Sequence, residues 1–166
     1  GKWLGYQHEG ILPDVVTSAK ALGNGVPIGA CLARGIAATI LSPGTHGSTF
    51  GGNPLACSAA LAVLDVVNEK NLLERSRLLG NFFATAFQRK LASRDEVIEV
   101  RGKGLMVGIE LDRPCGELVK ICSSRGVLIN VAAQNVVRLL PPLIISDDQA
   151  TEIVENVSAS IFDFLD

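Results

Sequence analysis

The chain has 166 residues, of which 48% are hydrophobic and 19% are charged, and its formal net charge is −2. This charge gives no sign of a nucleic-acid partner, and the length suits one domain with its own core or parts of two. Because about a quarter of the residues of an independent soluble protein are usually charged, we expect part of this surface to contact other protein.

Two short strands are predicted near the start of the chain. Residues 15–19 and 26–33 are apolar runs flanked by turn residues, and we interpret them as buried strands joined by a glycine-rich turn at residues 23–25. Lys20 directly follows the first strand. Open α/β sheets bind ligands beyond the carboxyl ends of their strands, so Lys20 stands at a candidate functional position.

A region with very few charges comes next. From Ala21 to Leu64 the only charged residue is Arg34, and the clustered glycines and prolines exclude a membrane-spanning helix. We predict a loop of small polar residues over 42–54 and a helix over 55–68. We expect these segments to be buried against other protein.

The remainder of the chain alternates helices and strands. We predict, in order, a helix over 70–92, strands over 97–100 and 105–111, a helix over 115–125, strands over 127–131 and 135–140, and a final helix capped by Ser146. The 70–92 helix is expected to be less buried than the helix over 55–68, and both it and the final helix place apolar residues on one face, with Phe82 and Phe83 on that of the 70–92 helix. In the strand over 105–111, Leu105, Val107, Ile109 and Leu111 alternate with Met106, Gly108 and Glu110. Residues 70–166 therefore read as an α+β domain that holds its own core.

The cysteines and histidines predict no metal site. None of the cysteines forms a C-x-x-C pair, and neither histidine stands at metal-ligand spacing from them. The four cysteines, which we expect to be free buried thiols, are Cys31, Cys57, Cys115 and Cys122. With no secretory segment at the start of the sequence, we expect a cytoplasmic protein.

Lys20 admits two interpretations from its local sequence. It is either an ordinary lysine that extends its amine to solvent, or a desolvated neutral amine that attacks a carbonyl and forms a Schiff base. The glycines after it do not indicate a nucleotide site, because Gly23-Asn-Gly25-Val-Pro-Ile-Gly29 is one residue too long for the dinucleotide fingerprint. Wider context has to decide.

Four blocks supply that context: AKALGNGVPIGA, HGSTFGGNPLA, RGKGLMVGIEL and VVRLLPPLIIS. Together they resemble the class III pyridoxal-phosphate-dependent aminotransferases of the ornithine and acetylornithine group, and the acetylornithine branch most of all. The resemblance covers essentially the whole chain. It implies an α/β fold, the C-terminal portion of a fold-type I transferase, with the end of the large cofactor-binding domain over residues 1–69 and the small α+β domain over 70–166.

The resemblance also implies roles for single residues. Lys20 matches the lysine that forms the Schiff base with pyridoxal 5′-phosphate and then serves as general base and acid. Thr49 matches the threonine that holds the cofactor phosphate, reached from the neighbouring subunit of a homodimer. Ser48 matches a position associated with the amino substrate, and Arg138 matches the arginine that binds the substrate α-carboxylate.

The implied reaction transfers an amino group from N-acetylornithine to 2-oxoglutarate in arginine biosynthesis, with ornithine or succinylornithine as alternative donors. The family's partners for the pyridine nitrogen and the cofactor ring are expected before Gly1, so we expect this chain alone to be inactive. A non-catalytic dimerisation or regulatory module derived from such an enzyme is the alternative. In that case the region with few charges serves only as an interface.

Overall fold

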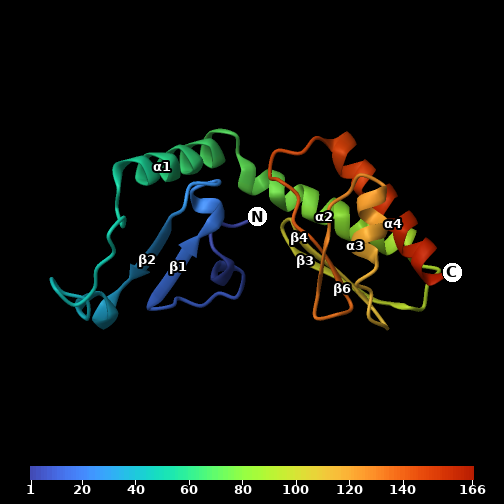
Figure 1. The fold of residues 1–166 in the computed structure, drawn as a ribbon, viewed down its shortest axis with the longest axis horizontal. Coiled ribbons are helices and arrows are strands. Elements are labelled where there is room, and N and C mark those ends of the chain that lie inside the picture. The colour runs from blue at the N-terminus through green and yellow to red at the C-terminus, as the bar shows by residue number, and fades with distance from the viewer. The chain divides into compact units, whose positions relative to one another are not determined.

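The structure is a computed structural model that describes residues 1–166. It divides into two compact units, one of Lys2–Asn71 and one of Leu72–Asp166 together with Gly1 (Figure 1). The division falls two residues beyond the boundary expected from the sequence. The assignment of the two units to a large and a small domain stays a prediction.

The unit Lys2–Asn71 contains one hairpin, three short 3₁₀ helices and one long helix. Its elements are η1 (Gly5–His8), β1 (Val15–Ala19), η2 (Lys20–Leu22), β2 (Gly29–Ala33), η3 (Gly35–Thr39) and α1 (Pro54–Glu69). Strands β1 and β2 pair antiparallel, with Val15 opposite Ala33 and Ala19 opposite Gly29. The second strand starts later than predicted because the Val26 N–H is used in the turn, where it donates to the Gly23 carbonyl (3.0 Å).

The prediction that these two strands are buried is wrong for this chain. Every residue of β2 is exposed, and β1 alternates between exposed and half-buried positions. The physical reason is that each strand has a single neighbour, so both edges of the sheet are open, and neither face is covered well enough to bury a residue fully. The apolar composition of the strands is not matched by burial within the chain.

Helix α1 begins where the sequence predicts it. The Asn53 side chain accepts a hydrogen bond from the Ala56 N–H (2.9 Å), and Pro54 occupies the first turn, where no N–H donor is needed. The expectation that this helix is more buried than the next one is wrong. Small residues dominate its buried face, which consists of Ala56, Ala60 and Val67.

The unit Leu72–Asp166 has a sheet of four strands and three helices. Its elements are α2 (Leu72–Lys90), β3 (Val97–Lys103), β4 (Met106–Leu111), α3 (Leu118–Ser124), β5 (Asn130–Ala132), β6 (Val136–Leu139) and α4 (Asp147–Leu165). The strand order is β3-β4-β6-β5, and all neighbours are antiparallel.

A single core joins these helices to one face of the sheet. Phe83 and Phe87 of α2 are fully buried, with nearly parallel rings whose centroids are 6.1 Å apart. The predicted alternation in β4 is confirmed, because Val107, Ile109 and Leu111 are buried while Met106 is exposed. Phe82, which the sequence places on the same helix face, is 39% exposed.

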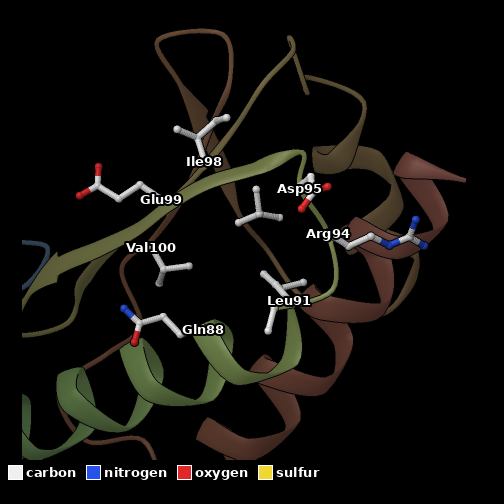
Figure 2. A pocket seen from close by; sticks show the side chains of 9 residues that line it. Gln88, Leu91, Arg94, Asp95, Ile98, Glu99 and Val100 are labelled. Carbon is white, nitrogen blue, oxygen red and sulfur yellow. The ribbon is translucent and has the colours of Figure 1, made fainter.

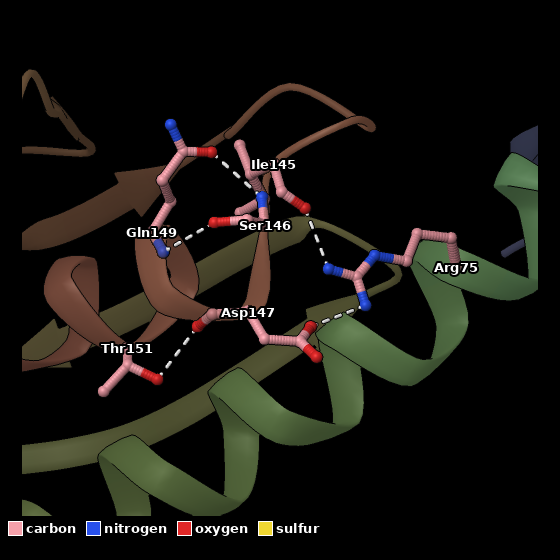
Figure 3. A network of polar contacts seen from close by, with 6 residues as sticks. All are labelled: Arg75, Ile145, Ser146, Asp147, Gln149 and Thr151. Carbon is pink, nitrogen blue, oxygen red and sulfur yellow. Dashed lines mark hydrogen bonds and ion pairs between the residues drawn. The ribbon is translucent and has the colours of Figure 1, made fainter.

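The start of α4 is fixed by two sets of polar contacts (Figure 3). The predicted capping box is confirmed: Ser146 Oγ accepts from the Gln149 N–H (3.1 Å), and the Ser146 N–H donates to Gln149 Oε1 (2.9 Å). Arg75 of α2 donates to the Ile145 carbonyl (2.8 Å) and forms an ion pair with Asp147 (2.7 Å). These contacts tie the beginning of α4 to the beginning of α2.

Backbone approaches backbone where α2 meets the turn between β3 and β4. A Cβ atom added at Gly80 would lie 2.3 Å from the carbonyl oxygen of Gly104, a distance that no side chain tolerates. Gly104 itself has φ +55°, a left-handed conformation that favours glycine. The helix can therefore lie directly on the turn only because position 80 has no side chain.

Candidate active site

Lys20 lies at the end of β1, as predicted. It is the first residue of η2, and the Gly23 N–H donates to its carbonyl oxygen (3.1 Å). Its backbone φ is +57°, which is left-handed and costs a residue other than glycine roughly 1–2 kcal/mol. Strain of this kind is concentrated at functional sites, where the surrounding fold holds a side chain in one direction.

The Lys20 side chain is exposed and makes no hydrogen bond or ion pair. The sequence-based interpretation that relies on a desolvated amine is therefore not met within this chain. What the structure does provide is an amine without a competing carboxylate, held on a strained turn. Such an amine is accessible to a carbonyl compound.

Ser48 and Thr49 lie in the exposed loop between η3 and α1. Neither hydroxyl makes a hydrogen bond within the chain. A Cβ atom added at Gly47 or Gly52 would meet no other atom, so the loop presents backbone amides without steric cover. A loop of this kind can bind an anion through its N–H and O–H groups.

The loop is anchored at its two ends rather than at its centre. At one end Thr45 Oγ1 donates to the Ser42 carbonyl (2.7 Å) and accepts from the Ser42 N–H (2.9 Å). At the other, Asn53 Nδ2 donates to the Phe50 carbonyl (2.9 Å) while its Oδ1 caps α1. No hydrogen bond links Lys20 to Ser48 or Thr49.

Arg138 lies on β6, in the other unit, and is exposed. Its apolar neighbours Val137 and Leu139 do not keep it from solvent, because they point to the opposite, buried face of the sheet. Seven of the nine arginines form ion pairs, and Arg138 is not among them. Its guanidinium is available to a carboxylate.

A group of charged residues that the sequence did not identify lies on the same face. Arg101 of β3 donates from Nη1 to Glu99 (2.7 Å) and to Glu110 of β4. These hydrogen bonds, first to Glu110 and then to Glu99, raise the pKa of Arg101. The signal in the sequence was the alternation of β4, which already placed Glu110 on the face opposite the core.

Three hollows of the molecule lie away from the predicted site residues. One of about 590 Å³ is lined by residues from the end of α2 to β3, among them Leu91 and Val100 (Figure 2). Two others, of about 460 and 400 Å³, lie beside α4. None of the three is lined by Lys20, Ser48, Thr49 or Arg138, each of which is exposed.

The remaining sequence expectations concern the thiols, metals and membranes. All four cysteines are free, but only Cys115 and Cys122 are buried, and the expectation of burial is wrong for the exposed Cys31. No group of three or more histidine, cysteine or acidic side chains is arranged to hold a metal ion. None of the helices combines the length and apolar character that a bilayer crossing needs.

Comparison with known proteins identifies the family. Residues 1–161 match the aminotransferase class-III family, and this chain belongs to it. Over all 166 residues it is 50% identical to the acetylornithine aminotransferase of Nitrosomonas europaea, of which it covers 42%. The chain thus spans about two-fifths of the length of the curated relatives it matches.

Solved structures agree on the fold. The acetylornithine aminotransferase of Elizabethkingia anophelis matches with a TM-score of 0.87 at 38% identity, covering 98% of this chain and 44% of that one. An ornithine aminotransferase of Toxoplasma gondii, with pyridoxal phosphate partly occupying its active site, matches with a TM-score of 0.91 at 34% identity, covering 98% and 39%. The fold is that of part of a fold-type I aminotransferase. It does not distinguish the acetylornithine aminotransferases from the ornithine aminotransferases.

Proposed function

We propose that this chain is part of a pyridoxal-phosphate-dependent aminotransferase that transfers an amino group from N-acetylornithine to 2-oxoglutarate, a step of arginine biosynthesis. The observation that carries the proposal is the 50% identity to an acetylornithine aminotransferase over the entire chain. Ornithine and succinylornithine remain the alternative donors. Since the chain covers 42% of that relative, the activity is proposed for the complete protein.

The residues present fit pyridoxal phosphate. Lys20 offers an exposed amine with no ion-pair partner, which suits an aldehyde. Thr49 and Ser48 offer unpaired hydroxyls in a loop whose glycines leave the backbone amides open, which suits a phosphate. The loop carries no acidic side chain that would repel an anion.

In the proposed site Lys20 has two tasks. Its amine would hold the cofactor through the cofactor's aldehyde group, and the free amine would act as the base that takes a proton from the substrate carbon that carries nitrogen. The same amine would then act as the general acid and give this proton back. When bound, the cofactor supplies a conjugated ring that takes up the electrons left on the substrate carbon.

Thr49 and Arg138 are proposed to position the reactants. The Thr49 hydroxyl donates to the cofactor phosphate, and the Ser48 hydroxyl contacts the amino substrate. The planar guanidinium of Arg138 binds the α-carboxylate that amino donor and oxo-acid acceptor share, which fixes the orientation of both. By family expectation the loop with Thr49 serves the neighbouring subunit of a cytoplasmic homodimer.

We further propose that the isolated chain does not turn over substrate. Lys20, Ser48, Thr49 and Arg138 are all exposed, so nothing in the chain excludes water from a reacting carbon. The complete protein has to supply the enclosure and the groups that hold the cofactor ring. Transamination by the purified 166-residue chain at a rate similar to that of the complete enzyme contradicts this proposal.

The test is a spectral titration of the complete protein with pyridoxal phosphate. We expect a new absorption band from the cofactor bound to a lysine, and its loss in Lys20→Ala. Lys70→Ala, an exposed lysine of the same unit, is the matched control and should keep the band. Steady-state kcat/KM values for N-acetylornithine, ornithine and succinylornithine then decide the donor.

A second candidate, a non-catalytic dimerisation or regulatory module, is favoured by one observation. Large apolar side chains of the unit Lys2–Asn71 are exposed, including Ile36 (84%), Phe50 (80%) and Leu55 (76%). Patches of this kind mark contact surfaces. A band that survives Lys20→Ala, or no band in the complete protein, supports this candidate over the enzyme.

A further inference from the structure

The exposed face of the four-stranded sheet carries an ordered row of residues around Arg138. The strand register places Arg101 of β3 opposite Gly108 of β4, Gly108 opposite Arg138 of β6, and Arg138 opposite Asn130 of β5. Gly108 therefore separates two arginines with a position that has no side chain. This gap is narrow, since a Cβ atom at Gly108 would lie 3.3 Å from Val136 Cγ1 and 3.8 Å from Arg101 Cγ.

Two carboxylates stand in the adjacent row. Glu99 lies directly opposite Glu110, in the same unbroken register that places Arg101 opposite Gly108, and the bulge between Val97 and Glu99 begins only beyond this row. Like charges at opposite positions of neighbouring strands destabilise a sheet. Arg101 relieves this repulsion because its Nη1 hydrogen bonds to both carboxylates.

Glu110 is also close to Arg138. It lies opposite Val136, two residues before Arg138 on the same strand, which makes Glu110 and Arg138 a diagonal pair. The Cα atoms of such pairs are about 7–8 Å apart, within reach of long side chains. Yet Glu110 pairs with Arg101, and Arg138 is left without a partner.

We propose that Arg101 is a positioning residue that keeps Arg138 available for the substrate carboxylate by holding Glu110 away from it. Without Arg101, repulsion from Glu99 drives the Glu110 carboxylate along the diagonal toward Arg138, past the side chain of Val136. The resulting internal ion pair competes with the carboxylate of the oxo acid. This inference rests on the proposed function, in which Arg138 binds that carboxylate.

The test compares four forms of the complete aminotransferase with 2-oxoglutarate as the varied substrate: wild type, Arg101→Met, Glu110→Gln and the double variant. Methionine keeps much of the apolar stem of Arg101 and removes its charge. We expect Arg101→Met to raise KM about fivefold, the effect of a competing exposed ion pair, with kcat within about twofold. Glu110→Gln alone should leave KM unchanged, and the double variant should return KM to near the wild-type value.

Arg113→Met is the matched control, because Arg113 forms an exposed ion pair with Asp112 outside the rows described above. It should leave KM unchanged. If Arg101→Met does not fold, Arg101→Lys and Arg101→Lys/Glu110→Gln form the same comparison with a smaller expected change.

Two outcomes overturn the inference: an unchanged KM in Arg101→Met, or a double variant whose KM stays as high as that of the single variant. Either result leaves Arg101 as a residue that only neutralises Glu99 and Glu110. Calorimetric titration of the same proteins with glutarate measures carboxylate binding without turnover. Absence of transamination in the wild type contradicts the proposed function, whereas the glutarate affinities still decide the role of Arg101.

Discussion

The two units of this chain differ in how well the chain covers its own apolar side chains. In Leu72–Asp166, Phe83 and Phe87 have no exposed surface, whereas in Lys2–Asn71 Phe50 is 80% exposed. Lys20, Ser48 and Thr49 all lie in the poorly covered unit. The difference teaches that the residues proposed for cofactor chemistry lie in the unit that leaves large apolar side chains exposed, while Arg138 lies on a unit that holds a core of its own.

Separating the units provides the strongest test of this comparison. We expect residues 72–166 alone to unfold in one cooperative transition, because the hydrophobic core lies entirely within them. We expect residues 2–71 alone to show no cooperative transition, since a two-stranded hairpin and one helix bury too little apolar surface. Thermal denaturation followed by circular dichroism measures both. A sharp transition in residues 2–71 contradicts the comparison.

Removing one aromatic side chain from each unit should have very different effects. Phe83→Ala leaves a cavity in the closed core, and we expect it to lower the free energy of unfolding by about 3–5 kcal/mol. Phe50→Ala removes an exposed side chain and should change it by less than about 0.5 kcal/mol. Urea denaturation of the 166-residue chain supplies both values. Equal losses would show that the coverage of Phe50 has been underestimated.

The two helix caps offer a smaller and closely matched pair. Ser146→Ala removes the acceptor for the Gln149 N–H and should destabilise the unit Leu72–Asp166 by about 1 kcal/mol. Asn53→Ala removes the equivalent bond to the Ala56 N–H, but we expect it to increase only local hydrogen exchange in the first turn of α1. Amide exchange rates separate a local effect from a global one.

The buried thiols of the unit Leu72–Asp166 give the smallest expected effect, a gradual change of its stability with pH. Burial raises the pKa of Cys115 and Cys122 above the ordinary value of 9.0, partly offset for Cys122 by a hydrogen bond from Ser160. A raised folded-state pKa gives stability that is complete below the unfolded-state pKa and is lost as pH rises through the folded-state pKa. We therefore expect residues 72–166 to lose stability above about pH 9, and Cys115→Ala to reduce that loss.

Cys31 is the control for this experiment. It is exposed on β2 and should react with a thiol reagent at once in the native chain, whereas Cys115 and Cys122 should react only on unfolding. Immediate labelling of all four thiols contradicts the closed core of the second unit.

Much of the fold could be predicted from the sequence because periodicity reports which face of an element has to be buried. The faces of α2 and α4 and the alternation of β4 were predicted in this way, as was the capping box at Ser146. The exposure of β1 and β2 could not be predicted, because an apolar run indicates that a strand needs a surface to pack against but does not show whether the same chain supplies that surface.

The candidate site shows the same limit. The position of Lys20 after a strand followed from local sequence, but its left-handed backbone did not, because lysine has no preference for that conformation. The Arg101 group escaped prediction because the predicted strand ended at residue 100, whereas β3 continues to Lys103 and places Arg101 opposite Gly108.

Gly80 of α2 affects the arrangement of the sheet because it has no Cβ atom. The turn between β3 and β4 rests on Gly80, and this turn sets which residue of β3 stands opposite which residue of β4. A side chain at position 80 would collide with the backbone of the turn and displace the row that contains Arg101 and Gly108. The residue type at position 80 thereby limits which side chains can stand side by side on the opposite face of the sheet.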